Sequence, residues 1–399
     1  MTAFALTPDA ARSALRGVDR VDELPDETVV DRYARAVWNL LTEPGDSIAG
    51  RLIEAAGAAG ALALTQDEES LLPGIEGVSP RALDEGLRRW RPRLVPDALA
   101  DALRSATACG ARMLLPGDPD WPTAVADLGP HAPHCLWVRG ATAALRSASP
   151  AVALVGARAA TGYGENVSAE LAAELGGGGV SVVSGAAYGI DGAAHRATLA
   201  AGGRTVALLA GGVDRPYPAG HSDLLGRIAA TGAVVSEVPC ASAPTKWRFL
   251  QRNRLIAALA DATVVVEAGW RSGSLNTAGH AAALGRPLGA VPGPVTSAAS
   301  AGCHRLLREF GATCVTHADD VRELLGINGS VAPVGPGTRT DDTTRVIDAL
   351  SPRAWQSTEA LARRTGMSAA AVEPILGLLW LEGGAERTDQ GWRAARVSR

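Results

Sequence analysis

The 399-residue chain carries 38 Lys and Arg against 42 Asp and Glu, a formal net charge of −4. A surface that is basic throughout is therefore excluded, and any nucleic-acid site must be a local patch. The 47% hydrophobic content is enough for a sizeable core and excludes a disordered chain. This length predicts two or three domains.

The cysteines, histidines and apolar runs indicate the cellular location of the protein and whether it holds a metal site. The five cysteines are odd in number, scattered and without a CxxC pair, so we expect reduced thiols in a cytoplasmic protein, with no disulfide framework or zinc site. The seven histidines show no HExxH or other metal spacing. No run of about 18 apolar residues and no signal-peptide pattern is present, so we expect no membrane span.

The front of the chain, residues 1–105, predicts a small helical domain. Ser79 and Pro80 are suited to the cap and first position of a helix. Leu83, Leu87 and Trp90 would then share one buried face. The Arg88–Arg93 run is interpreted as the solvated end of that helix.

Residues 106–325 predict a core of a different kind, an α/β domain with a mostly parallel sheet. Leu136–Gly140 is expected to be a short strand at an edge of that sheet. Six further apolar runs are expected to be strands: Ala151–Val155, Val180–Ser184, Thr205–Leu209, Val234–Ser236, Ala262–Glu267 and Pro287–Val291. The segments between them have helical character, which is typical of a parallel sheet covered on both faces. Ligands bind such sheets beyond the carboxyl ends of the strands, where the loops here are rich in Gly, Pro and polar residues.

The last part of the chain predicts a linker and a small domain. Residues 326–342 are rich in Gly, Pro, Ser and Thr, as flexible linkers are. Residues 343–399 predict helix, helix-turn-helix and hairpin, the winged-helix plan. The third helix, from Ser368, offers few Arg, Asn or Gln side chains to read bases, which argues against a sequence-specific regulator. We expect this domain to contact protein or to add an auxiliary DNA contact.

Two common nucleotide cofactors are excluded by the loops that follow the strands. A Walker A loop needs a Gly-Lys-Ser/Thr sequence, and Lys246, the only lysine, lies between Thr245 and Trp247. A dinucleotide fingerprint needs a middle glycine, which the stretch Gly156–Gly162 lacks, and an acid after the second strand, where Ser184-Gly185 stands instead. We therefore expect no ATP, GTP, NAD(P) or FAD.

Two basic features predict a phosphate site. Arg158 follows the first long strand, where its planar guanidinium can grip phosphate oxygens. The stretch Lys246–Arg254 holds four cations and two aromatic residues in nine positions, a combination typical of single-strand binding. Its Arg252-Asn253-Arg254 end is expected to lie at the start of a helix beginning near Leu255, where the helix dipole favours an anion.

Hydrolytic chemistry remains as an alternative. Asp191 and His195 are four residues apart, but no nucleophile elbow accompanies them, so a capping Asp191 and a buried His195 are favoured. A nucleotide phosphoribohydrolase is the second hypothesis, with four candidate carboxylates: Asp191, Asp214, Glu237 and Glu267. Glu267 could contact a ribose or order its loop, and the sequence does not decide between them.

Taken together, these motifs resemble the DprA/Smf family, the bacterial DNA-processing proteins of natural transformation. The resemblance covers about Asp118 to His317 in order and spacing. It rests on Asp118-Pro-Asp-Trp-Pro122, Val155-Gly-Ala-Arg158, Tyr163-Gly164, Ser184-Gly-Ala-Ala-Tyr-Gly-Ile-Asp-Gly-Ala-Ala-His195, Gly211-Gly-Val-Asp214, Tyr217-Pro218, Ser236-Glu-Val-Pro239, Arg252-Asn-Arg-Leu-Ile256, Val264-Val-Val-Glu-Ala268, Ser272-Gly-Ser274 and Val291-Pro-Gly293. The helical front, of a SAM or helix-hairpin-helix type, and the winged-helix end also look like the family's accessory domains.

The resemblance implies an extended Rossmann-like core that binds single-stranded DNA, forms a homodimer, protects incoming strands and loads the RecA recombinase, without catalysis or a cofactor. The family's DNA pocket carries over onto Arg158, Ser184, Gly185, Lys246, Phe249, Arg252, Asn253, Arg254, Ser272 and Gly273. Many members have arginine where Tyr188 stands, so stacking on Tyr188 is expected to replace a phosphate contact there. Many have proline at Leu250, so the segment before Arg252 is expected to be less rigid.

Overall fold

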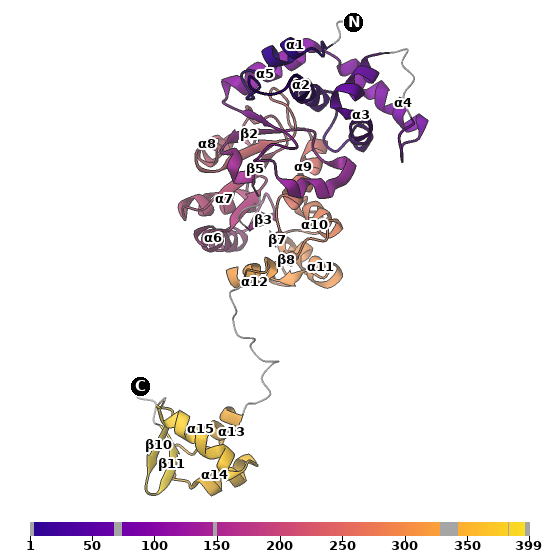
Figure 1. Ribbon diagram of the computed structural model, residues 1–399. Helices are drawn as coiled ribbons and strands as arrows, with labels where there is room; N and C mark the ends of the chain where they lie inside the picture. The colour runs from indigo at the N-terminus through magenta and orange to yellow at the C-terminus, as the bar shows by residue number, and fades with distance from the viewer. Residues whose placement is uncertain (1–3, 68–73, 147–149, 328–341, 382, 396–399) are drawn as a thin grey trace. The chain divides into compact units, whose positions relative to one another are not determined.

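The computed structural model describes residues 4–67, 74–146, 150–327, 342–381 and 383–395 (Figure 1). The chain divides into two compact units, Met1–Asn328 and Gly329–Arg399. Most of the predicted linker, 326–342, lies outside the described residues.

The first unit is built on a nine-stranded sheet in the order β1-β2-β6-β5-β4-β3-β7-β8-β9. The strands from β3 to β9 pair in parallel, and β2 is antiparallel to both of its neighbours. Their bounds are β1 (Arg112–Leu114), β2 (Leu136–Gly140), β3 (Ala151–Gly156), β4 (Ser181–Ser184), β5 (Thr205–Leu209), β6 (Ala233–Ser236), β7 (Ala262–Glu267), β8 (Leu288–Ala290) and β9 (Thr313–Cys314). The predicted mostly parallel Rossmann-like α/β fold is confirmed.

The predicted place of β2 at an edge of the sheet is wrong. β1 pairs with its outer side, in register from Arg112–Val138 to Leu114–Leu136, and forms the edge instead. With only three residues, β1 is too short to show a strand period in the sequence.

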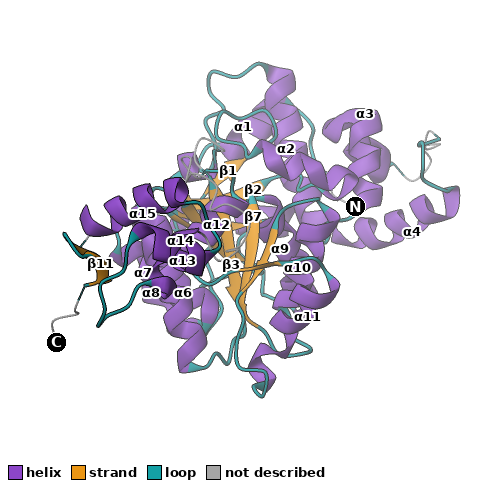
Figure 2. Cartoon of the chain, turned by 90° about the horizontal axis from the view of Figure 1, so that it is seen from below, coloured by secondary structure: helices purple, strands orange, loops and turns teal. Residues whose placement is uncertain are grey.

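Helices cover both faces of the sheet, as Figure 2 shows. One face carries α6 (Gly162–Gly177), α7 (Ile190–Ala200), α8 (Ser222–Thr231) and α12 (Ala318–Leu324), and the other carries α9 (Lys246–Ala258), α10 (Ser274–Ala283) and α11 (Ala301–Glu309). Side chains alternate between the two layers: Val152 and Leu154 of β3 pack toward α6 and α7, whereas Ala153 and Val155 pack toward α9. Burial on both faces explains why the strand sequences are continuously apolar.

The order of the strands creates a switch point between β3 and β7. From β3 the chain adds β4, β5 and β6 on one side, then returns through α9 to add β7, β8 and β9 on the other. The loops after β3 and β7 therefore diverge and leave a crevice at the carboxyl edge of the sheet.

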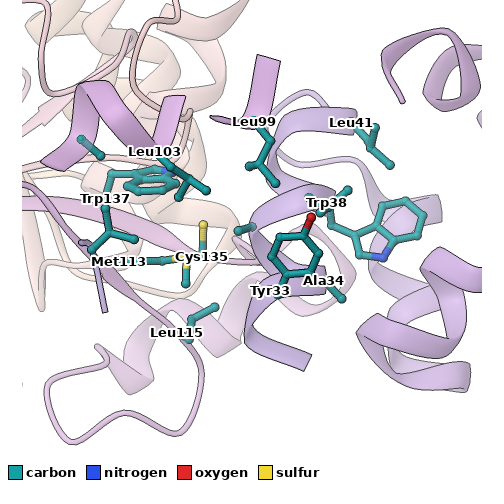
Figure 3. Close-up of a cluster of buried hydrophobic side chains, with 14 of the residues drawn as sticks. Tyr33, Ala34, Trp38, Leu41, Leu99, Leu103, Met113, Leu115, Cys135 and Trp137 are labelled. Carbon is teal, nitrogen blue, oxygen red and sulfur yellow. The ribbon is translucent and has the colours of Figure 1, made fainter. Parts of the chain in front are cut away.

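The N-terminal helices share a core with the β1–β2 end of the sheet. They are α1 (Pro8–Leu15), α2 (Asp26–Leu41), α3 (Ser47–Gln66), α4 (Pro80–Trp90) and α5 (Pro96–Ala108). Figure 3 shows Tyr33, Leu99 and Leu103 of these helices close to Met113 and Trp137 of the strands. Ser79 caps α4 as predicted, by accepting a hydrogen bond from the Ala82 N–H. The predicted helical front is thus present, and it packs with the sheet as one compact unit.

Among the described residues, α3 is the one helix long and apolar enough to cross a membrane by length and composition. Gly57 interrupts it, with φ 69° and ψ 161°. Buried side chains such as Leu52 and Leu62 belong to the N-terminal core.

Short 3-10 helices complete the first unit, at η1 (Arg91–Arg93), η2 (Thr123–His131), η3 (Thr142–Leu145), η4 (Ala219–His221) and η5 (Ala298–Ser300). Arg91 and Arg93 of η1 donate to backbone carbonyls of Thr65, Asp67 and Leu41. These side chains hold the end of α4 against α2 and α3.

The second unit is a winged-helix domain, as predicted. It contains α13 (Asp342–Ala349), α14 (Thr358–Thr365) and α15 (Ala369–Leu381), followed by the hairpin of β10 (Ala385–Thr388) and β11 (Gly391–Ala394). The Ser357 hydroxyl caps α14, and Gly366 ends it in the left-handed conformation. Val372, Leu376 and Leu379 of α15 are buried in its core.

A buried polar bridge between α2 and the sheet gives the first prediction. Asn39 accepts a hydrogen bond from Trp137 Nε1 at 2.8 Å and donates one to the Glu237 carbonyl. Asn39→Ala leaves both groups buried without a partner, so the free energy of unfolding should fall by about 2–4 kcal/mol. Urea denaturation measures this change. Asn166→Ala, at an exposed position of α6, is the matched control and should stay within about 0.5 kcal/mol of the unmodified chain; equal effects of both variants would contradict the bridge.

Candidate functional site

A pocket of about 510 Å³ opens at the switch point between β3 and β7. Three loops form its sides: the one after β3, the one between β4 and α7, and the one between β7 and α10. The helix α9 forms the remaining wall through Phe249, Leu250, Arg252, Asn253 and Ile256. The pocket therefore lies where ligands of open α/β sheets bind.

The helix α9 begins at Lys246, where the Thr245 hydroxyl accepts a hydrogen bond from the Arg248 N–H. The predicted start near Leu255 is wrong, and Arg252 and Arg254 lie in the middle of the helix. Apolar periodicity missed this part of the helix because Lys246 and Trp247 are exposed and the residues buried next, Arg252-Asn253-Arg254, are polar or cationic. The helix dipole therefore acts at the exposed Lys246 and not at Arg252.

Arg252 is the buried cation of the pocket wall. Its side chain is 7% exposed, and its Nη1 donates to the carbonyls of Gly185 and Leu208 at 2.7 and 2.5 Å. Burial lowers the pKa of Arg252 to about 10, which leaves the guanidinium charged at neutral pH. A Cβ at Gly185 would lie 2.2 Å from this Nη1, so a glycine is needed there.

The loop between β4 and α7 is held from below by Asp191. The Asp191 carboxylate accepts hydrogen bonds from the N–H groups of Gly185 at 3.1 Å and Ala187 at 3.4 Å. Burial raises the pKa of this carboxyl group. Gly189, with φ 71°, lets this loop approach the one after β3, because a Cβ there would lie 2.3 Å from the Ala157 carbonyl oxygen.

Phe249 is the aromatic residue of the pocket wall, with Tyr217 packed against it and Tyr188 next in sequence to the lining residue Ala187. The Phe249 ring has the Arg158 guanidinium 4.7 Å from its centroid, and the Tyr217 ring lies 5.5 Å away. Tyr188, which is 50% exposed, packs edge-on against His221 at 4.8 Å. Cations over aromatic faces and exposed aromatic rings offer both charge and stacking surface.

The structure brings together six of the predicted site residues in the pocket wall: Arg158, Phe249, Arg252, Asn253, Ser272 and Gly273. Lys246 and Tyr188 are exposed outside that wall. Ser184 is fully buried, and its hydroxyl donates to the Leu154 carbonyl at 2.6 Å. Gly185 contacts Arg252 from below.

Arg254 is buried on the other side of α9. Its Nη1 and Nη2 donate to the two carboxylate oxygens of Glu237 at 2.6 and 2.7 Å, and Nη2 also donates to the His131 carbonyl. This geometry ties α9 to the loop after β6 and to η2. Arg254 therefore supports the wall from behind and does not face the pocket.

The sequence analysis missed Arg271, an exposed cation in the pocket wall. The signal for it was its place directly before Ser272-Gly273 in a loop at the carboxyl edge. Across the described ranges, Arg158, Lys246, Arg252 and Arg271 form no ion pair with a carboxylate, although most other arginines do. Unpaired cations at one edge give this site a positive charge in a chain of net charge −4.

The four carboxylates of the alternative hypothesis have structural contacts. Glu267 accepts hydrogen bonds from the N–H and hydroxyl of Thr161 at 2.8 and 2.7 Å, so it orders the loop after β3. Asp214 accepts from the Ala241 N–H at 3.1 and 3.0 Å. With Glu237 paired to Arg254 and Asp191 bound to its own loop, these oxygens are engaged by the fold.

His195 is fully buried and structural, as expected from the sequence. Its Nδ1 lies 2.7 Å from the Thr205 hydroxyl, which itself donates to the Val182 carbonyl. Nδ1 must therefore carry a proton, and because burial lowers its pKa the ring is neutral at neutral pH. No hydrogen bond joins it to Asp191 among the described contacts. Burial lowers the pKa of His195 to about 3.

The fold and this site define an α/β protein with a cationic pocket at the switch point of its parallel sheet. Residues 112–326 match the family model of DNA recombination-mediator protein A, and residues 330–391 match that of the DprA winged helix domain. The chain belongs to the DNA recombination-mediator protein A (DprA) family, which confirms the resemblance drawn from its motifs.

Individual relatives agree with this assignment. A DprA relative from Mycobacterium tuberculosis (strain ATCC 25618 / H37Rv) is 49% identical over 317 residues, covering 75% of this chain and 81% of the relative. The DNA processing protein DprA of Bacillus subtilis (strain 168) is 37% identical over 193 residues, or 48% and 64% of the two chains. The X-ray structure of DprA from Streptococcus pneumoniae superposes with a TM-score of 0.59 at 30% identity, covering 73% of this chain and 97% of that one.

The buried neutral His195 predicts a pH dependence of stability. Its pKa in the folded state, about 3, lies below the ordinary value of 6.5. Between these two pH values the histidine is protonated in the unfolded chain and neutral in the folded chain. This contribution to stability is present above pH 6.5 and is lost as the pH falls toward 3. His195→Gln should make the slope of unfolding free energy against pH shallower by up to about 1.4 kcal/mol per pH unit. Urea denaturation between pH 4 and pH 7 measures it, with exposed His131→Gln as the control; unchanged slopes would contradict the assignment.

The Arg254–Glu237 pair predicts a stability effect without a direct ligand effect. Arg254→Met leaves the Glu237 carboxylate buried and unpaired, which should lower the free energy of unfolding by about 3–5 kcal/mol. The double variant Arg254→Met/Glu237→Gln removes that buried charge and should recover much of the loss. Urea denaturation of both variants measures this, and a double variant no more stable than the single one would show that the charge is not the cause.

Proposed function

We propose that the chain binds single-stranded DNA in the switch-point pocket and acts as a recombination mediator that protects incoming strands and loads RecA. The observation that carries this proposal is the group of unpaired cations, Arg158, Lys246, Arg252 and Arg271, beside exposed aromatic rings. Cations track a phosphate backbone and aromatic rings stack on unpaired bases, which together hold a single strand. Membership of a family of DNA recombination mediators supports the same function.

The proposed contacts follow from exposure. Arg158, Arg271 and Lys246 reach solvent and bind phosphates, while Arg252 supplies positive charge from the pocket wall. Phe249 and Tyr188 offer ring faces or edges to the bases, and Ser272 and Gly273 form the polar rim opposite α9. Asn253 donates to the Gly273 carbonyl at 3.3 Å and to Asn276 at 3.2 Å, so it fixes that rim. Ser184, Gly185 and Arg254 act indirectly, by holding the loops and α9.

Single strands fit this site better than duplexes. The pocket volume of about 510 Å³ lies in the range of small-ligand sites and suits a base with its sugar or phosphate. In a duplex the bases are stacked and paired, so their faces are not available to Tyr188 or Phe249. Binding without sequence preference is expected, since every base has a face to stack.

No catalysis is part of this proposal. A phosphoribohydrolase needs a free carboxylate near the ribose, and the four candidates are engaged by the loops they hold. We expect no base release from nucleoside monophosphates. Base release that Glu267→Gln abolishes would instead establish the enzyme.

The remaining parts of the proposal come from the family resemblance: a homodimer, a cytoplasmic location and contact with RecA. The winged-helix domain is assigned an auxiliary role, because α15 presents few base-reading side chains. RecA-driven strand exchange on the same oligonucleotide, with and without this protein, tests the loading step. No stimulation of that exchange would remove RecA from the proposal.

The DNA site is tested by fluorescence titration of oligo(dT) over a salt series. Arg158→Ala should weaken binding about 10- to 150-fold, the loss of one charge-assisted contact of about 1.5–3 kcal/mol, with an unchanged thermal melt. The slope of log affinity against log salt should fall by about 0.7 for each phosphate contact removed. Arg227→Ala, an exposed arginine on α8, is the charge-matched control. Equal affinity of the two variants, or equal preference for duplex DNA, would contradict the proposal.

A further inference from the structure

A second hollow lies on the other side of the first turns of α9. It has a volume of about 540 Å³ and lies between α9, the segment that joins α2 to α3, and the end of α4. Its walls include Leu41, Pro44, Ile48, Trp90 and Trp247. We call it the α9 groove, and none of the predicted site residues lines it.

Trp247 is the feature of the α9 groove that points to a ligand. Its side chain is 56% exposed in the first turn of α9, next to Lys246. An indole that stays exposed to water, beside a cation without an ion-pair partner, contributes little to the stability of the folded chain. The same pair provides a stacking face and a phosphate contact for one nucleotide.

The two hollows are neighbours across one helix. Phe249, Leu250 and Arg252 line the switch-point pocket, and Trp247 and Gln251 line the α9 groove. The two sets of residues lie on different sides of the same two turns of α9. The helix α9 alone therefore separates the two hollows. Lys246 is exposed in the first turn of α9, where a strand passing from one hollow to the other would cross.

The charges of the α9 groove favour a base there over a phosphate. Its two acids are already neutralised, Glu43 by Arg93 and Arg248, and Asp46 by Arg89. Asp46 also accepts a hydrogen bond from Trp90 Nε1 at 3.0 Å. What remains is an apolar wall with polar groups at its rim, including the Gln251 side chain, as a flat heterocycle requires.

We propose that the α9 groove is a second nucleotide subsite, in which a base of the same strand stacks on Trp247 while Lys246 binds the adjoining phosphate. This inference rests on the proposed single-strand binding in the switch-point pocket. It extends the DNA path from the sheet onto the N-terminal helices, so α2, α3 and α4 form part of the binding surface.

The test uses the full chain and oligo(dT) of about 3 to 16 nucleotides, which spans common single-strand site sizes. In the unmodified chain, affinity should rise once the strand is long enough to reach the α9 groove. Trp247→Ala should remove that gain, about 5- to 150-fold, the equivalent of about 1–3 kcal/mol for one stacked base, and leave the shortest strands unaffected. Trp247→Phe should keep most of the gain, because it keeps a stacking ring.

Comparing Arg158→Ala with Trp247→Ala across strand lengths distinguishes the α9 groove from single-strand binding in the switch-point pocket. Arg158→Ala should weaken strands of every length, since every strand uses the switch-point pocket. Unchanged affinity of Trp247→Ala at all lengths would overturn the subsite and leave single-strand binding intact. The same loss at every length would place Trp247 in the first pocket and also overturn it. Failure of the unmodified chain to bind any oligo(dT) would remove both.

Discussion

A buried guanidinium with no carboxylate in hydrogen-bond contact, that of Arg252, is the constraint on which the rest of the site depends. Removing such a charge from water is costly, and two strand-end carbonyls, Gly185 and Leu208, compensate by accepting from it. The loop after β4 must therefore stay close, which requires a glycine at 185 and the backbone contacts made by Asp191. The guanidinium lines the pocket, where the nearby Asp191 carboxylate interacts with it without a hydrogen bond, and an anion bound there would lower its energy further.

The helix that carries Arg252 is also the crossover of the sheet. As the chain returns from β6 to β7, α9 passes over the switch point and contacts the loops on both sides. One face of it presents Phe249 and Arg252 to the pocket. The other pairs Arg248 with Glu43 and Arg254 with Glu237, which fixes the helix to the segment between α2 and α3 and to the loop after β6. The position of the site is thus a result of topology, and its rigidity is a result of buried ion pairs.

Much of this fold was predictable because central parallel strands are apolar on both faces. The six predicted core strands and the winged helix were found with small shifts at their ends. Elements that bury polar groups or have only a few residues were not: α9 begins nine residues before the predicted start, and β1 replaces β2 at the edge. The periodicity of apolar residues reveals only side chains that are buried because they are apolar. Arg252 and Arg254 are polar, and their burial is compensated by hydrogen bonds, so this pattern does not reveal them.

The lining of the pocket was predicted in part for a similar reason. The position of Arg158 after a strand predicted its place at the pocket, and family motifs predicted Ser272 and Gly273 there. Arg271 lies beside them without a motif of its own and was missed. Ser184 and Arg254 belong to those motifs, yet their side chains face the interior. A family motif does not distinguish residues that contact a ligand from residues that support the ligand-contacting ones.

The position of Lys246 has a practical consequence. It supplies the single side-chain amine of the whole chain, and it is exposed in the first turn of α9 between the two hollows. Amine-reactive reagents would therefore modify one side chain, at the mouth of the site, besides the α-amino group. Acylation of that side chain removes its positive charge, so the charge at this one position can be removed chemically without any engineered residue.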